Sequence, residues 1–201
     1  MTTLATIDEI KKTIPFLSNK WTKQNDIDDN DTGFIYYCQK LKQVIDLSTT
    51  NNCDIDYAIH RWYNFQCSKY VENLFCKYGA IHYQDEKDHD IDILIEDIPF
   101  DVKLSVISSK YCGNKNLSNR DNKDKYIKWL QENQSMEGRK HTKNKLYVIC
   151  KPRNNEEDKL ICKSKFEVIE PKIQSFMNYF KTNIDNYKNK ELINELIFVE
   201  T

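Results

Sequence analysis

Two neighbouring runs of alternating apolar and polar residues constrain the fold of this chain more than any other feature. The first run is HDIDILI at 89–95, the second is FDVKLSVI at 100–107, and EDIP at 96–99 separates them. Alternation with a period of two is typical of a strand that buries one face. Two such strands joined by a short polar link predict a β-hairpin.

The register of this hairpin determines which polar side chains meet on its second face. A loop at 97–98 or 96–99 pairs residues whose numbers sum to 195, which puts Asp92 opposite Lys103. Asp92 and Asp101 then become diagonal neighbours, about 5–7 Å apart between backbones. Two carboxylates at that distance repel each other unless a cation lies between them, and such oxygen-rich pairs bind Mg²⁺ or Mn²⁺. A polar, solvated sheet face is the alternative interpretation.

Regular elements are expected on both sides of the hairpin. Residues 62–78 predict a helix whose apolar stripe contains Cys67, Val71, Leu74 and Phe75, and Gly79 ends it. Glu72 lies at the border of this stripe, where its carboxylate could join the hairpin acids. A short strand at 80–84, a loop at 108–120, a helix at 121–133 and a strand at 145–150 complete the order helix, three strands, helix, strand.

The remaining segments are expected to extend this core within one domain of 201 residues. Residues 1–60 are predicted to form an N-terminal helical extension, with a polar loop at 24–32 and a helix near 34–47. Residues 61–150 form the core. Residues 151–201 form a C-terminal extension with these expected elements: a strand near 160–163, a helix at 168–182, and a helix or strand near 190–199.

The order of the elements and the acids of the hairpin resemble the PD-(D/E)XK nuclease superfamily. That family has an αβββαβ core, an acid in the second strand, and an Asp or Glu followed by any residue and Lys in the third. Asp92 and Asp101-Val102-Lys103 match this motif, and Glu72 matches an acid often carried by the first helix. Asp90 remains an alternative to Asp92, because neither acid has the proline that commonly precedes it in the family.

This resemblance implies an α/β fold with a restriction-endonuclease-like αβββαβ core, a mixed central sheet and flanking helical extensions. It also implies one Mg²⁺, with Mn²⁺ as a substitute, held by Asp92 (or Asp90), Asp101 and the carbonyl of Val102, with Glu72 assisting. Such an ion supplies Lewis-acid chemistry to a phosphodiester. Lys103 would orient or deprotonate the attacking water and stabilise the developing negative charge.

Charge is segregated along the chain in a way that suits a nucleic-acid substrate. The formal net charge is −1, but residues 103–145 contain 11 Lys and Arg against 4 Asp and Glu. We expect this segment to lie along the phosphate backbone. The candidate contact residues are Arg139, His141, Lys143, Gln134 and Ser105.

Several other classes of protein find no support in the sequence. The seven cysteines contain no CxxC pair, and there is no Gly-rich phosphate loop and no HExxH motif. No apolar run is long enough for a membrane span, and no signal peptide is recognisable, so a cytoplasmic protein is expected.

The function expected from the sequence is cleavage of DNA in restriction or phage defence, by a homodimer or a subunit of a defence complex. RNA cleavage, or nucleic-acid or protein binding without cleavage, are the alternatives.

Overall fold

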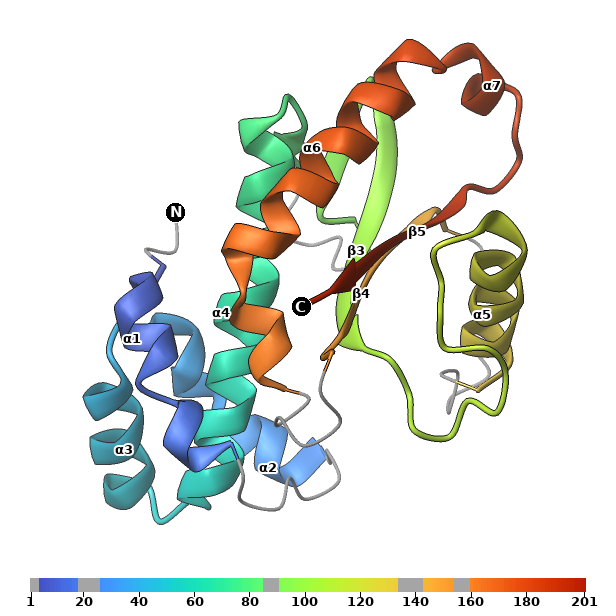
Figure 1. Cartoon of the computed structure of the whole chain (residues 1–201). Helices are drawn as coiled ribbons and strands as arrows, with labels where there is room; N and C mark the ends of the chain where they lie inside the picture. The colour runs from blue at the N-terminus through green and yellow to red at the C-terminus, as the bar shows by residue number, and fades with distance from the viewer. Residues whose placement is uncertain (1–3, 18–25, 85–90, 134–142, 154–159) are drawn as a thin grey trace.

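The chain folds into a five-stranded sheet with helices on both faces (Figure 1). This computed structural model describes residues 4–17, 26–84, 91–133, 143–153 and 160–201. The helices are α1 (Ile7–Lys11), the 3₁₀ helix η1 (Ile14–Phe16), α2 (Asp26–Asp31), the 3₁₀ helix η2 (Gly33–Tyr37), α3 (Leu41–Thr50), α4 (Ile55–Lys77), α5 (Arg120–Asn133), the 3₁₀ helix η3 (Ile161–Ser164), α6 (Phe166–Thr182) and α7 (Asp185–Lys188). The strands are β1 (Ile81–His82), β2 (Ile93–Ile95), β3 (Ile98–Val106), β4 (Lys145–Lys151) and β5 (Asn194–Glu200).

The sheet is mixed, with strand order β1-β2-β3-β4-β5. The pairs β1–β2 and β2–β3 are antiparallel, whereas β3–β4 and β4–β5 are parallel. The prediction of an α/β fold with a mixed central sheet is therefore confirmed.

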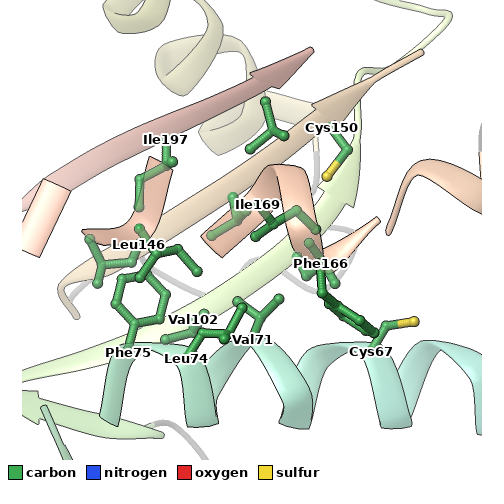
Figure 2. Packing of buried hydrophobic residues seen from close by; sticks show 14 of the residues in the cluster. Cys67, Val71, Leu74, Phe75, Val102, Leu146, Cys150, Phe166, Ile169 and Ile197 are labelled. Atoms are coloured by element: carbon green, nitrogen blue, oxygen red, sulfur yellow. The ribbon is translucent and has the colours of Figure 1, made fainter. Parts of the chain in front are cut away.

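Helix α4 covers the predicted helix at 62–78 up to Lys77 and begins earlier, at Ile55. The Asp54 side chain caps it by accepting a hydrogen bond from the Tyr57 N–H at 3.0 Å, which satisfies one of the four unpaired N–H groups of a helix start. The predicted apolar stripe packs against β3, β4, β5 and α6 (Figure 2). Val71 and Phe75 are fully buried there.

Strand β4 is apolar on both faces because helices cover both sides of the sheet. Leu146, Val148 and Cys150 belong to the larger hydrophobic cluster, which includes α4 and α6. Tyr147 and Ile149 belong to a second cluster with α5 on the opposite face. Figure 1 shows α4 and α6 on one side of the parallel strands and α5 on the other.

The predicted hairpin forms, but its register differs from the expected one. Ile93 pairs with Phe100 and Ile95 with Ile98, so the paired residue numbers sum to 193 instead of 195. The two linking residues are Glu96 and Asp97, with φ of 48° and 63°. A two-residue turn with both φ values positive matches the right-handed twist of the flanking strands, and this match selects the observed register.

Two predictions about the N-terminal segment were wrong. The polar stretch at 24–32 was expected to be a loop, yet it contains α2; its Asp29 forms an ion pair with Arg61 of α4, with Nε 3.3 Å from Oδ1. The helix expected near 34–47 is split into η2 and α3. The break is at Cys38, whose backbone is extended (φ −82°, ψ 129°) and whose carbonyl accepts a hydrogen bond from Trp62 Nε1 at 2.9 Å.

In the C-terminal segment, the strand expected near 160–163 is instead η3, a 3₁₀ helix. The predicted helix at 168–182 is confirmed as α6, and the segment near 190–199, left open between helix and strand, forms β5. The asparagine that precedes β4 fixes the start of this strand, because Asn144 Oδ1 accepts the Ile193 N–H at 2.8 Å. No helix within the described ranges is both long enough and apolar enough to span a membrane.

Candidate active site

Asp92 lies immediately before β2, and its side chain is anchored to the neighbouring strand. Its Oδ2 accepts the main-chain N–H of Val102 at 2.8 Å, and its own N–H donates to the carbonyl of Phe100 at 2.9 Å. The carboxylate therefore lies next to β3 at the point where the pairing of β2 with β3 ends. The acid chosen from the alternating pattern is thus adjacent to the Asp-x-Lys segment, although by a different register from the predicted one.

Asp101 and Lys103 are both on β3 and contact each other, with Lys103 Nζ 2.8 Å from Asp101 Oδ1. The Asp101 side chain is only 10% exposed, whereas that of Lys103 is 51% exposed. Burial raises the pKa of Asp101, and the carboxylate of Asp92 raises it further, while the ammonium of Lys103 opposes the rise. The carboxylate of Asp92 is therefore close enough to Asp101 to disfavour its ionised form.

Glu72 approaches the same place from α4. It is 4% exposed, and its Oε2 lies 2.7 Å from Lys69 Nζ, one helical turn earlier. Burial raises the pKa of Glu72 to about 7; Lys69 opposes this rise and Asp92 adds to it. Lys69 Nζ also lies 3.7 Å from Asp92 Oδ1, so this lysine bridges the two acids.

Lysines therefore partner each of the three predicted acids. Lys145, at the start of β4, lies 3.9 Å from Asp101 Oδ2, on the far side of Asp101 from Asp92. Within the described ranges, no three His, Cys, Asp or Glu side chains are close enough together to hold a metal ion by themselves. The site is a network of alternating carboxylates and ammonium groups, and a cation here would be held by two acids at most.

The main chain of β3 adds one oxygen to this arrangement. The N–H of Asp101 points towards β4, because it donates to the Asn144 carbonyl at 3.0 Å, and the N–H of Val102 points the opposite way, towards Asp92. In a strand, the N–H and C=O of one residue face the same neighbour. The carbonyl of Val102 is therefore on the same side of β3 as the carboxylate of Asp92.

The predicted nucleic-acid contacts are only partly described. Asp90, Gln134, Arg139 and His141 lie outside the described residues. Lys143 lies two residues before β4, close in sequence to Lys145 of the site. Ser105 is half-buried on β3, two residues beyond Lys103.

Sequence reasoning did not find Lys69 or Lys145. Lys69 had a detectable signal, since a lysine three residues before a glutamate on a helix lies on the same face. Lys145 had none, because its approach to Asp101 depends on the parallel register of β4, which pairs Lys145 with Asp101.

A scan of protein-family models and searches of curated proteins and of solved structures found no match to this chain.

Proposed function

We propose that this protein is a metal-dependent endonuclease that hydrolyses DNA phosphodiester bonds on a restriction-endonuclease-like core of the PD-(D/E)XK type. One observation carries the proposal. The carboxylates of Asp92 and Asp101 flank Val102 on β3, and Lys103 follows with its ammonium on Asp101 and half of its side chain in solvent. Two acids and an accessible lysine around one main-chain carbonyl suit a phosphodiester better than an uncharged substrate.

The oxygens present fit a Mg²⁺ ion, for which Mn²⁺ would substitute. Mg²⁺ is commonly held by one or two carboxylates together with waters and substrate phosphate, so a cluster of three acids is unnecessary. Asp92, Asp101 and the carbonyl of Val102 would hold it. When bound, the ion supplies Lewis-acid stabilisation of the phosphoryl oxygens.

The lysines then have distinct roles. Lys103 is exposed enough to contact both the substrate phosphate and the attacking water, which it orients while stabilising the charge that develops on the phosphoryl group. Lys69 holds Asp92 and Glu72 together, and Lys145 holds the other oxygen of Asp101. Glu72, which loses its proton near neutral pH, positions Lys69 and would assist in holding the ion through water.

A binding-only function is the second candidate, and the same lysines favour it. Lys69, Lys103 and Lys145 already supply cations to the acids, so the network is electrostatically balanced without a metal ion.

RNA cleavage is a variant of the first candidate, because the reacting group is a phosphodiester in both nucleic acids. A biological role in restriction or phage defence, as a cytoplasmic homodimer or as a subunit of a defence complex, is part of the proposal.

The test is incubation of the purified protein with supercoiled plasmid, in parallel with a structured RNA, in Mg²⁺, Mn²⁺ or EDTA. We expect metal-dependent nicking or linearisation of the plasmid that is lost in Asp101→Asn. Asp97→Asn is the matched control, because it makes the same chemical change in the hairpin turn, where Asn tolerates the positive φ. Cleavage of the RNA alone would make RNA the substrate in place of DNA. Cleavage of neither nucleic acid would favour the binding-only function.

A further inference from the structure

A cleft continues from Lys103 along the edge of β3 beyond the end of β2. Its volume is about 820 Å³, within the range of pockets that hold small organic ligands. Residues 103–106 of β3 form one wall. The other wall is a face of α4 with residues at helical spacing, namely Arg61, Asn64, Phe65 and Ser68. Glu72 continues this same face, so the cleft and the candidate active site are adjacent.

The depth of the cleft contains a buried ammonium group. Lys163 of η3 is 7% exposed and donates a hydrogen bond to Asn64 Oδ1. An ammonium has three N–H donors, and no carboxylate within the described residues forms an ion pair with this one. Burial lowers the pKa of Lys163, and the neighbouring Cys67, Cys150 and Cys162 oppose this change. A buried charge is costly unless an opposite charge or hydrogen bonds accompany it.

The other two cations that line the cleft each have a carboxylate partner, Asp101 for Lys103 and Asp29 for Arg61. Arg61 forms an ion pair with Asp29, which also accepts a hydrogen bond from the Tyr57 hydroxyl at 2.5 Å. The guanidinium of Arg61 also packs on an aromatic ring of the cleft, at 5.1 Å from the ring centre of Tyr36. The Tyr36 ring meets that of Phe65 edge-to-face at 4.9 Å, and Tyr36 is 39% exposed. Among the described residues, the cleft thus combines one cation that has no carboxylate partner with an accessible aromatic ring.

We propose that this cleft binds one nucleotide unit, with its phosphate at Lys163 and Asn64 and its base against Tyr36. The inference rests on the proposed nucleic-acid substrate, and it adds where a nucleotide next to the scissile phosphate is held. A phosphate offers an anion to Lys163, which has no carboxylate partner among the described residues, and a base stacks on an aromatic side chain without sequence preference. A terminal nucleotide, an internal nucleotide and a free nucleotide share this chemistry.

The test measures binding to the full chain in EDTA, so that cleavage does not interfere. The probes are thymidine 5′-monophosphate, thymidine, inorganic phosphate, and a circular and a linear single-stranded DNA, the latter with and without a 5′-phosphate. We expect Lys163→Met to weaken binding of the monophosphate at least tenfold, and Tyr36→Ala to weaken it about fivefold while leaving inorganic phosphate unaffected. Lys188→Met, an exposed lysine on α7, is the matched control. Circular dichroism verifies the fold of each variant.

The outcomes separate this inference from the proposed function. Preference for the 5′-phosphorylated strand assigns the cleft to a terminus, and equal binding of the circular strand assigns it to an internal nucleotide. Binding of the monophosphate alone assigns it to a free nucleotide. Lys163-dependent binding without any cleavage would retain the nucleotide site and reject the nuclease. Cleavage and nucleotide binding that are unchanged in Lys163→Met would reject the site and retain the nuclease.

Discussion

The carboxylate of Asp92 accepts the main-chain N–H of Val102 at 2.8 Å, in place of the strand partner that β2 no longer provides. This hydrogen bond fixes Asp92 beside Asp101, the residue before Val102, although the two acids are nine positions apart in the chain. One side chain thus completes the main-chain hydrogen bonding of β3 and contributes to the candidate active site.

Asp92 should therefore show separate structural and functional effects on substitution. Asp92→Asn keeps an oxygen that accepts the Val102 N–H, so we expect a melting temperature close to that of the wild type. The lost charge should lower the cleavage rate about 100-fold or more. Asp92→Ala also leaves a buried N–H unpaired, which should cost about 1–3 kcal/mol in the free energy of unfolding. Thermal unfolding and plasmid cleavage of both variants measure this; equal stability of the Asn and Ala variants would contradict it.

Lys103 should affect cleavage far more than binding. Lys103→Met removes the ammonium that contacts Asp101 while keeping a similar side-chain length, so we expect at least a 100-fold loss of cleavage rate. DNA affinity measured in EDTA should change less than threefold, because one partly exposed cation contributes little to it. Lys188→Met serves as control for the loss of one positive charge. Wild-type cleavage by Lys103→Met would remove Lys103 from the mechanism.

Glu72 should make stability depend on pH in a defined direction. Burial raises its pKa from the usual 4.5 to about 7, so the folded protein binds a proton that the unfolded chain has released between these pH values. The contribution of protonated Glu72 to the free energy of unfolding is complete below pH 4.5 and is lost as the pH rises through about 7. Glu72→Gln does not lose this contribution. The free energy of unfolding of the variant minus that of the wild type should therefore be up to about 3 kcal/mol higher at pH 8.5 than at pH 4.

Urea unfolding of both proteins across this pH range measures the effect. Glu170→Gln provides a control of opposite sign, because hydrogen bonds from Lys77 and Tyr78 lower the pKa of the half-buried Glu170. The contribution of ionised Glu170 to the free energy of unfolding is present above the pKa that this residue has in the unfolded chain, and it is lost as the pH falls. Parallel pH profiles for wild type and Glu72→Gln would show that Glu72 does not titrate near neutrality.

The turn between β2 and β3 should limit stability through its backbone conformation. Asp97 has a φ of 63°, which Asn and Gly adopt readily and β-branched residues do not. We expect Asp97→Asn to be neutral, Asp97→Gly to stabilise by about 0.5 kcal/mol, and Asp97→Val to destabilise by about 1–2 kcal/mol. Chemical denaturation gives the three values. A stable Val variant would indicate that the turn is not held in this conformation.

Much of the local structure could be predicted because it depends on patterns within single segments. The apolar stripe of α4, the alternation in β2 and β3 and the continuous apolar run of β4 were each sufficient to identify their elements. The errors fall where a distant residue competes with local preference. Arg61 of α4 forms an ion pair with Asp29 in the acidic stretch that folds as α2, and Trp62 donates to the carbonyl of Cys38, where η2 ends.

The same distinction between local pattern and distant contacts applies to the candidate site. The sequence by itself determined that Asp101 and Lys103 share one side of a strand and that Asp92 and Glu72 belong to its neighbours, because side-chain direction follows from periodicity. Only the tertiary structure decided the hairpin register, the approach of Lys69 and Lys145 to the acids, and the placing of Lys163 in the adjacent cleft. These depend on backbone turns and on the parallel pairing of strands separated by about 40 residues, and side-chain periodicity does not encode either.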